Sequence, residues 1–204
     1  VYATLANYGK RPEIASITKV TNYKGIILEE NGCGAASGQE PGCSGEQVLD
    51  PRVAFTLVDI LKDNNARSPS FGSNSQLVIP KHAEVAVKTG TSNDLRDNLT
   101  VGFNQKYLVA VWVGNNDNSP MARIASGVTG AAPIWNKILS ALLAKEENHP
   151  WETPSGLKQV AICTLTGTLT CGGCPTKMEW FLEEKVPTKA CSVEQVQKIE
   201  EENK

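Results

Sequence analysis

The stretch EVAVKTGTSNDLRDNLTVGF, from Glu84 to Phe103, carries the pattern that decides the fold. It predicts one strand over Glu84 to Thr91 and a second over Leu99 to Phe103, joined by a short polar link. A third strand, YLVAVWV from Tyr107 to Val113, is apolar on both faces, so we expect it to be central in a sheet. The short links favour antiparallel neighbours.

Helices are predicted before and after these strands. The first, in LDPRVAFTLVDILKDNNA, starts with Asp50 as N-cap and Pro51 at the first helical position, and the second, in GAAPIWNKILSALLAK, has Pro133 in its first turn. The expected buried stripes are Val53, Leu57 and Ile60 or Leu61 in the first helix, and Ile134, Ile138 and Leu142 in the second. A sheet followed by a helix predicts an α+β fold.

The first residues, VYATLANYGKRP, have the pattern of the last turns of a helix that stops near Gly9 and Pro12. Because the sequence starts inside this helix, we expect it to be a piece of a longer protein. EIASITKVTNYKGIILEE then predicts a hairpin or two successive strands around Asn22 to Gly25, and NGCGAASGQEPGCSG predicts a glycine-rich loop.

Composition excludes several classes of function. The 204 residues can form one sizeable domain with a small appendage, and a formal net charge of -2 gives no sign of the basic patch that a nucleic acid favours. No apolar run approaches the roughly 20 residues that span a bilayer, and no signal peptide is visible at the start. We expect no nucleic-acid partner, and a membrane link only through an N-terminal anchor absent from this sequence.

The cysteines fall into two groups. Their even number suits a disulfide framework formed in an oxidising compartment, with reduced, unpaired thiols as the alternative. Zinc is a third possibility because two of them form a C-x-x-C, but a convincing site would need a second such pair. We therefore expect no metal and no cofactor. Their positions are Cys33 and Cys43, predicted to close the glycine-rich loop, and Cys163, Cys171, Cys174 and Cys191.

Three segments are expected along the chain. Residues 1–145 form the main domain, residues 146–158 are polar and proline-bearing and are predicted to be a linker, and residues 159–204 form a small cysteine-bearing C-terminal tail.

The tetrapeptide KTGT suits acyl transfer on an anionic peptide. In a strand Thr89 and Thr91 share a face, so their hydroxyls can grip a carboxylate. Gly90 lets a substrate lie close to the backbone, and Lys88 brings a positive charge. On an edge strand the N–H of Thr91 can donate to a developing oxyanion. Lys88 and Thr91 are the candidate catalytic residues, and Thr89, Gly90 and Thr91 the candidate substrate-binding residues; an ordinary solvated strand is the alternative.

A resemblance supports the first interpretation. VKTGTSNDLRDNLTVGF, YLVAVWVGNNDNSPM and SGVTGAAPIWNKIL resemble the strands and terminal helix that close the transpeptidase domain of class A, bifunctional penicillin-binding proteins. The similarity covers about residues 1 to 145, and the tail resembles an extension that some members carry. One departure is Leu99 and Thr100, where the family often has aromatic residues. The resemblance implies a β-lactamase/transpeptidase-like antiparallel sheet with flanking helices, here incomplete.

The nucleophile of that family is missing from this sequence. The family uses a serine in S-x-x-K followed by S-x-N, and no Ser-x-Asn occurs here. SITK, from Ser16, falls in a strand-like run, where Lys19 points away from the serine. SGLK, from Ser155, follows a proline and contains a glycine, so it is not expected to form the helical turn that the pairing needs. His82 and His149 are expected to be solvated surface residues.

Two hypotheses remain. The first is the C-terminal portion of a D,D-transpeptidase domain acting on peptidoglycan stem peptides and β-lactams. The resemblance then implies an upstream segment with the serine, a glycosyltransferase domain, and a place on the extracytoplasmic face of the bacterial cytoplasmic membrane. Apolar faces should be exposed where the upstream half packs. The second is a non-catalytic cell-wall binding or structural module on the same scaffold.

Overall fold

The structure is a computed structural model that describes residues 1–12, 17, 19–30, 45–121 and 129–202. It divides into two compact units, Val1–Trp151 and Glu152–Lys204. The division falls inside the segment that the sequence predicts to be a linker. Among the described residues, no helix has both the length and the apolar character that crossing a membrane requires.

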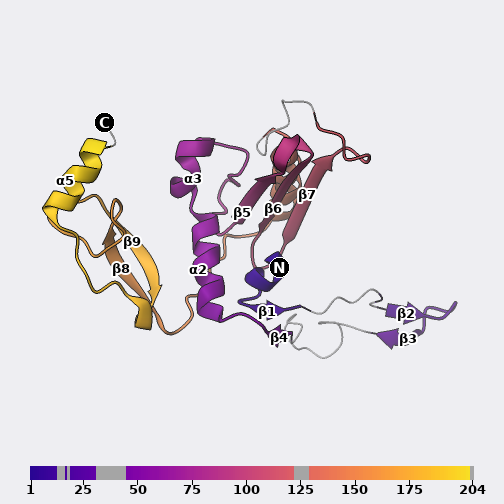
Figure 1. The fold of residues 1–204 in the computed structure, drawn as a ribbon. Helices are drawn as coiled ribbons and strands as arrows, with labels where there is room; N and C mark the ends of the chain where they lie inside the picture. Colours follow the sequence, from indigo (N-terminus) through magenta and orange to yellow (C-terminus); the bar gives the residue numbers. More distant parts are fainter. Residues whose placement is uncertain (13–16, 18, 31–44, 122–128, 203–204) are drawn as a thin grey trace. The chain divides into compact units, whose positions relative to one another are not determined.

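The centre of the first unit is a three-stranded antiparallel sheet (Figure 1). Its strands are β5 (Ala86–Thr91), β6 (Asp97–Phe103) and β7 (Leu108–Gly114), in the order β5-β6-β7. The predicted strands and their antiparallel pairing are therefore confirmed. The prediction that YLVAVWV is central was wrong for the described strands, because β6 lies in the middle and β7 at an edge.

Helix α4 (Ala131–Leu143) covers one face of the sheet. The indole of Trp135, on this helix, is fully buried and packs against Gly102, which has no side chain to prevent the contact. Val87 and Val109, on the same face, contribute to this core. The other buried members of the cluster come from α4 and from the segment before β5: Leu77, Ile79, Val85, Ala132, Leu139 and Leu143.

Helices α1 (Tyr2–Ala6) and α2 (Pro51–Lys62) pack together, α1 also against β6 and β7 and α2 also against β5. On this side of the sheet the rings of Phe103 and Tyr2 have centroids 6.1 Å apart. Trp151 closes the same region, since its ring meets Phe103 edge-on and its Nε1–H donates to the backbone oxygen of Glu84 at 2.7 Å. The remaining elements of the unit are β1 (Lys10–Arg11), β2 (Lys19–Thr21), β3 (Ile27–Glu30), β4 (Glu46–Gln47), α3 (Asn64–Phe71) and a short 3₁₀ turn, η1 (Asn93–Leu95).

The helix starts were predicted correctly, but the buried stripes were not. Asp50 caps α2, and Pro51 is its first residue. The buried residues of α2 are Ala54, Phe55 and Val58, and those of α4 are Ala131, Ala132, Trp135, Leu139 and Leu143. The predicted Leu57, Ile60, Ile134, Ile138 and Leu142 are exposed instead.

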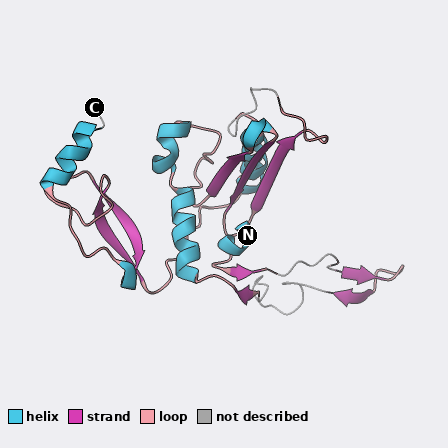
Figure 2. Ribbon diagram, viewed as in Figure 1, coloured by secondary structure: helices cyan, strands magenta, loops and turns pink. Residues whose placement is uncertain are grey.

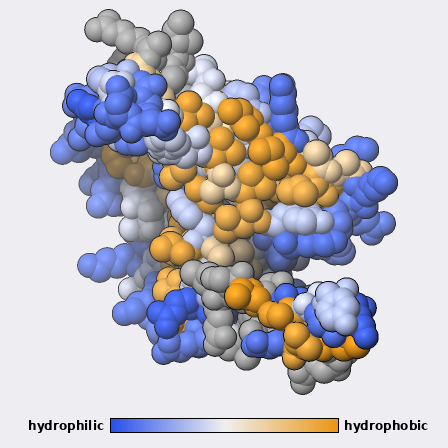
Figure 3. Space-filling view, turned by 90° about the vertical axis from the view of Figure 1, so that its right-hand side faces the viewer, coloured by the Kyte–Doolittle hydropathy of each residue, from blue (hydrophilic) through white to orange (hydrophobic). Residues whose placement is uncertain are grey.

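Apolar side chains also remain exposed on the sheet. Leu99, Leu108 and Trp112 lie on the face opposite α4, and each is more than a third exposed. Figure 3, which views the molecule from the side where β7 lies in Figure 1, shows a broad apolar surface. This agrees with the expectation of exposed apolar faces.

The N-terminal hairpin is as predicted: β2 and β3 pair antiparallel around the turn from Asn22 to Gly25 (Figure 2). The predicted Cys33–Cys43 disulfide lies outside the described residues.

The second unit is a hairpin with a helix. Strands β8 (Leu157–Cys163) and β9 (Thr176–Leu182) pair antiparallel, followed by the 3₁₀ turn η2 (Glu183–Lys185) and helix α5 (Val193–Glu202). Disulfides join Cys163 to Cys174 and Cys171 to Cys191. The disulfide framework expected from the sequence is thus present in the tail.

Candidate active-site strand

The KTGT residues lie on the edge strand of the sheet. Lys88, Thr89, Gly90 and Thr91 of β5 pair with β6, and the other edge of β5 has no partner strand among the described residues. Just beyond them, the N–H of Ser92 donates to the backbone oxygen of Asp97 at 2.9 Å. Because antiparallel strands alternate the direction of their backbone groups, the N–H and C=O of Thr89 and Thr91 then point toward the open edge.

The four residues alternate between the two faces of the sheet. Thr89 and Thr91 share the face that carries Asn98 and Thr100, whereas Lys88 and Gly90 lie on the other face. The exposed Lys88 side chain curls back, and its Nζ donates to the backbone oxygen of Thr89. Its ammonium therefore reaches the edge at which the Thr91 N–H points.

Asn98 supports the site, although its sequence position does not predict this role. Its side chain is fully buried; Nδ2 donates to the hydroxyl of Thr91 at 3.2 Å, and Oδ1 accepts the N–H of Ala131 at 2.7 Å. Gly130, the N-cap of α4, has no side chain to cap the helix, so Asn98 does so from the neighbouring strand. An asparagine inside the strand DNLTVGF, directly opposite Thr91 of the KTGT strand, is the signal that could have found it.

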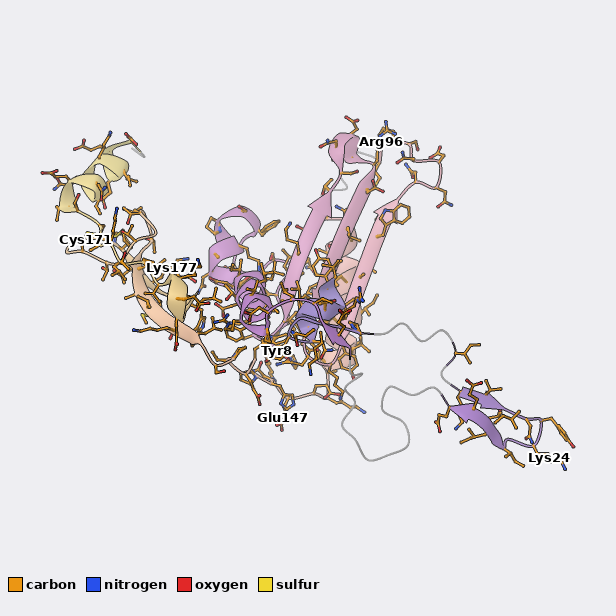
Figure 4. All side chains as sticks on the ribbon, turned by 60° about the horizontal axis from the view of Figure 1, so that its bottom comes forward. Tyr8, Lys24, Arg96, Glu147, Cys171 and Lys177 are labelled. Atoms are coloured by element: carbon orange, nitrogen blue, oxygen red, sulfur yellow. A yellow bond between two sulfur atoms is a disulfide. The ribbon has the colours of Figure 1, made fainter. Side chains whose placement is uncertain are left out.

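The turn that joins β5 and β6 is held by polar contacts. Asp97 accepts a hydrogen bond from Trp112 Nε1 at 3.0 Å and donates its own N–H to the hydroxyl of Ser92 at 2.8 Å. Hydrogen bonds from the side chains of Trp112 and Ser92 lower the pKa of Asp97 below its ordinary value, so its carboxylate stays charged. Arg96 donates to the backbone oxygen of Asn118, and Figure 4 shows Arg96 at this end of the sheet.

The residues where the sequence departs from the family pattern lie on opposite faces. Leu99 stands opposite Gly90 on the exposed face. Thr100 faces α4 and is fully buried, and its hydroxyl has no hydrogen-bond partner among the described residues.

The other candidates do not assemble a second site. Ser155 and Lys158 are separated by Gly156, whose φ of 80° belongs to a turn, and Lys158 lies in β8, so no helical turn aligns them. Ser16 lies outside the described residues. The expectation that His82 is solvated was wrong: it is buried, and its Nδ1 lies 2.9 Å from Oε1 of the buried Glu84. His149 is exposed, as expected.

Several known proteins are similar to this chain. The family model described as "Penicillin-binding protein 1A, C-terminal domain" matches residues 153–195. Penicillin-binding protein 1A of Pseudomonas aeruginosa is 31% identical over 143 residues, which cover 70% of this chain and 17% of the relative. Penicillin-binding protein 1A of Clostridium tetani is 28% identical over 196 residues, which cover 93% of this chain and 23% of the relative.

Solved structures show the same fold. The crystal structure of penicillin-binding protein 1A from Haemophilus influenzae matches with a TM-score of 0.77 at 22% identity, over 94% of this chain and 32% of that one. PonA1 from Mycobacterium tuberculosis, solved in complex with penicillin V, matches with a TM-score of 0.57 over 74% of this chain and 40% of that one. The chain spans about a fifth of the length of the curated relatives, with coverages of 17% and 23%. It belongs to the class A penicillin-binding proteins, and it corresponds to the C-terminal portion of their transpeptidase domain.

Proposed function

We propose that the protein containing this chain cross-links peptidoglycan by D,D-transpeptidation, and that the chain supplies the KTG strand of the site but not the serine nucleophile. The observation that carries the proposal is the open edge of β5. The N–H of Thr91 points toward this edge, the ammonium of Lys88 reaches it, and the hydroxyls of Thr89 and Thr91 lie on one face beside it. The relatives are named for binding penicillin, and PonA1 was solved with penicillin V.

Each group at the edge has a role in acyl transfer. A serine from elsewhere in the protein attacks the carbonyl of the penultimate D-Ala; the amide bond breaks, terminal D-Ala leaves, and an acyl-serine ester forms. The Thr91 N–H stabilises the oxyanion that develops in this step. The hydroxyls of Thr89 and Thr91 and the ammonium of Lys88 hold the carboxylate of the stem peptide. An amine of a second stem peptide then attacks the ester and completes the cross-link.

The surrounding protein is part of the proposal. The serine is placed in an upstream transpeptidase segment, behind a glycosyltransferase domain and a membrane anchor, on the extracytoplasmic face of the cytoplasmic membrane. The two disulfides of the second unit support that compartment, because disulfides persist where the surroundings are oxidising. A β-lactam would bind at the same edge as the stem peptide.

The test uses the whole protein encoded by the reading frame that contains this chain. Acylation by a fluorescent penicillin should fall roughly 10- to 100-fold in Lys88→Ala and Thr91→Val, the range for one hydrogen bond to a charged group. The Lys88 side chain is exposed, so Lys88→Ala should leave the melting temperature unchanged. Thr91→Val removes the acceptor of the buried Asn98 and should lower the melting temperature, so acylation is measured well below both transitions. Lys106→Ala is the matched control, because Lys106 is an exposed lysine of the β6–β7 turn that pairs with Glu146.

Three results would contradict the proposal or part of it. Unchanged acylation in Lys88→Ala and Thr91→Val would remove the role of the KTGT edge. A whole protein that takes up no penicillin would favour the non-catalytic binding module instead. By intact-mass analysis the 204-residue chain alone should form no penicillin adduct, and an adduct at Ser16 or Ser155 would show that the chain has its own nucleophile.

A further inference from the structure

The four cysteines of the second unit lie close together. Cys163 ends β8, Cys171 and Cys174 lie in the turn before β9, and Cys191 lies just before α5. The Sγ atoms of Cys163, Cys174 and Cys191 all lie within 4.8 Å of one another, and Cys171 is bonded to Cys191. Figure 4 labels Cys171 between the β8–β9 hairpin and α5. We call these four residues the cysteine cluster.

The spacing of the cysteine cluster suits a tetrahedral metal ion. With Zn–S bonds of about 2.3 Å, the sulfurs of a four-thiolate zinc site stand roughly 3.8 Å apart. After the two S–S bonds open, the bonded sulfurs have to move apart to that distance, and the sulfur of Cys171, which is bonded only to Cys191, has to approach the other two. The cluster therefore offers four sulfur ligands to one ion.

The backbone of the C-x-x-C turn supports the same arrangement. The N–H of Cys174 donates to the oxygen of Cys171 at 3.3 Å, and Gly173 takes the φ of 84° that lets the chain reverse tightly. In the sequence, the lack of a second C-x-x-C pair argued against a zinc site. The fold supplies that pair, since it brings the end of β8 and the start of α5 to the turn.

Donor type and burial define the class of ion. Among the described residues, no histidine or carboxylate joins the group, and all-sulfur donors favour Zn²⁺ over Mg²⁺ or Ca²⁺. Cys163 is fully buried and Cys191 nearly so, packed with Val196. Cys171 and Cys174 are half-buried. Four protein ligands that leave no open coordination position are typical of a structural zinc site rather than a catalytic one.

We propose that the cysteine cluster, once its disulfides are reduced, binds one Zn²⁺ as a structural four-cysteine site. A dithiol reductant gives each disulfide two electrons and two protons and is itself oxidised to a disulfide, which leaves four thiols. Zn²⁺ then binds the four sulfurs and displaces the thiol protons. The second unit can thus be cross-linked in two alternative ways, by two disulfides or by one metal ion. This site is independent of the proposed transpeptidation.

The experiment titrates cobalt into the whole chain carrying Cys33→Ser and Cys43→Ser, so that only the cysteine cluster can supply thiolates. After reduction by a phosphine without oxygen, Co²⁺ should bind at one ion per chain, with the intense absorption of tetrahedral thiolate coordination, and Zn²⁺ should displace it. Zn²⁺ should also protect the four thiols from alkylation, as counted by mass. The oxidised chain should bind neither ion.

Two variants separate metal binding from disulfide formation. Cys171→Ser should lose stoichiometric binding. Cys171→His can still ligate a metal but can no longer form a disulfide, so it should keep one ion per chain with a shifted cobalt spectrum. The proposal fails if the reduced parent chain binds no Co²⁺ and its thiols alkylate equally with and without Zn²⁺, or if Cys171→Ser binds as the parent does.

Discussion

Two glycines of the sheet have opposite surroundings, and this allows a paired prediction. A Cβ added to Gly102 would lie 2.2 Å from Cζ2 of the buried Trp135, whereas one added to Gly90 would meet nothing within 4 Å. Gly102→Ala should therefore destabilise the fold by about 1–3 kcal/mol, the usual cost of overpacking. Gly90→Ala should leave the melting temperature unchanged but slow penicillin acylation, because its methyl group would stand where the substrate backbone approaches.

Thermal unfolding and acylation of the whole protein check this pair. The reverse pattern, a stable Gly102→Ala and an unfolded Gly90→Ala, would contradict the packing described here. Unchanged acylation in a stable Gly90→Ala would show that the substrate keeps its distance from the strand.

At the site, the sequence could predict residue types but not their support. The shared face of Thr89 and Thr91 could be predicted, because side chains two residues apart in a strand point to the same side. The part played by Asn98 was not, because it depends on which residue of α4 lies over β6. Its two hydrogen bonds join Thr91 to the start of α4 across a sequence separation that no local pattern reports. His82 was also missed: it is buried beside the buried Glu84, and Asn104 contacts the same carboxylate from 20 residues away.

At the scale of elements, boundaries were more predictable than buried faces. Asp50 and Pro51 fix the start of α2 through local chemistry. Helix α4, however, is apolar on several sides, so two stripes at the same spacing compete. The core accepts Trp135, Leu139 and Leu143, because the indole fits over Gly102, and the predicted stripe from Ile134 faces outward. Periodicity cannot choose between such stripes, because the choice depends on the shape of the opposing surface.

The start of α2 provides a prediction about pH. The carboxylate of Asp50 accepts a hydrogen bond from the backbone N–H of Arg52 at 2.8 Å and forms an ion pair with the Arg52 guanidinium. These contacts lower the pKa of Asp50 below 3.8; the largest cause is the hydrogen bonding to the Arg52 side chain, and the next is the backbone hydrogen bond. Because the pKa is lower in the folded state, the charged carboxylate stabilises the fold at every pH above the pKa of the unfolded chain. This stabilisation is lost as the pH falls through the folded-state pKa. Asp50→Asn keeps a cap but removes the charge, whereas Asp50→Ala removes both.

At neutral pH, urea unfolding measured by circular dichroism should therefore give the largest free energy of unfolding for the parent, a smaller one for Asp50→Asn and the smallest for Asp50→Ala. The advantage of the parent over Asp50→Asn should shrink as the pH falls below 3.8. An advantage that persists unchanged into strong acid would mean that the Asp50 charge does not contribute through Arg52.

At the scale of the whole molecule, the sequence predicted a main domain, a linker and a cysteine-bearing tail. The structure divides the chain after Trp151, because this indole is anchored to Glu84 and packs on Phe103 and Tyr8. Composition marks such a segment as polar and proline-bearing, but it cannot show that one tryptophan in it belongs to the core. The pairing of the tail cysteines was open for the same reason, since it depends on where β8 ends relative to α5.

The two units should respond differently to reduction, because they are held together by different forces. The first has an apolar core between sheet and α4, whereas the second has a two-stranded hairpin, which is marginal by itself, and a small cluster around Cys163, Cys191 and Val196. Its disulfides span separations of 11 and 20 residues, and closing loops of that size contributes about 3 kcal/mol each. Reduction without metal should therefore unfold the second unit and leave the first intact.

Hydrogen exchange measured by mass spectrometry checks this prediction peptide by peptide. Reduction should accelerate exchange in β8, β9 and α5 but not in β5, β6 and β7, and added Zn²⁺ should restore the slow exchange only in the second unit. If the reduced second unit keeps its protection from exchange in the presence of a chelator, its hairpin is stable without disulfides or metal, and the prediction is wrong. If β5 to β7 lose protection as well, the two units do not fold independently, because breaking the disulfides of one would then cost the other its core.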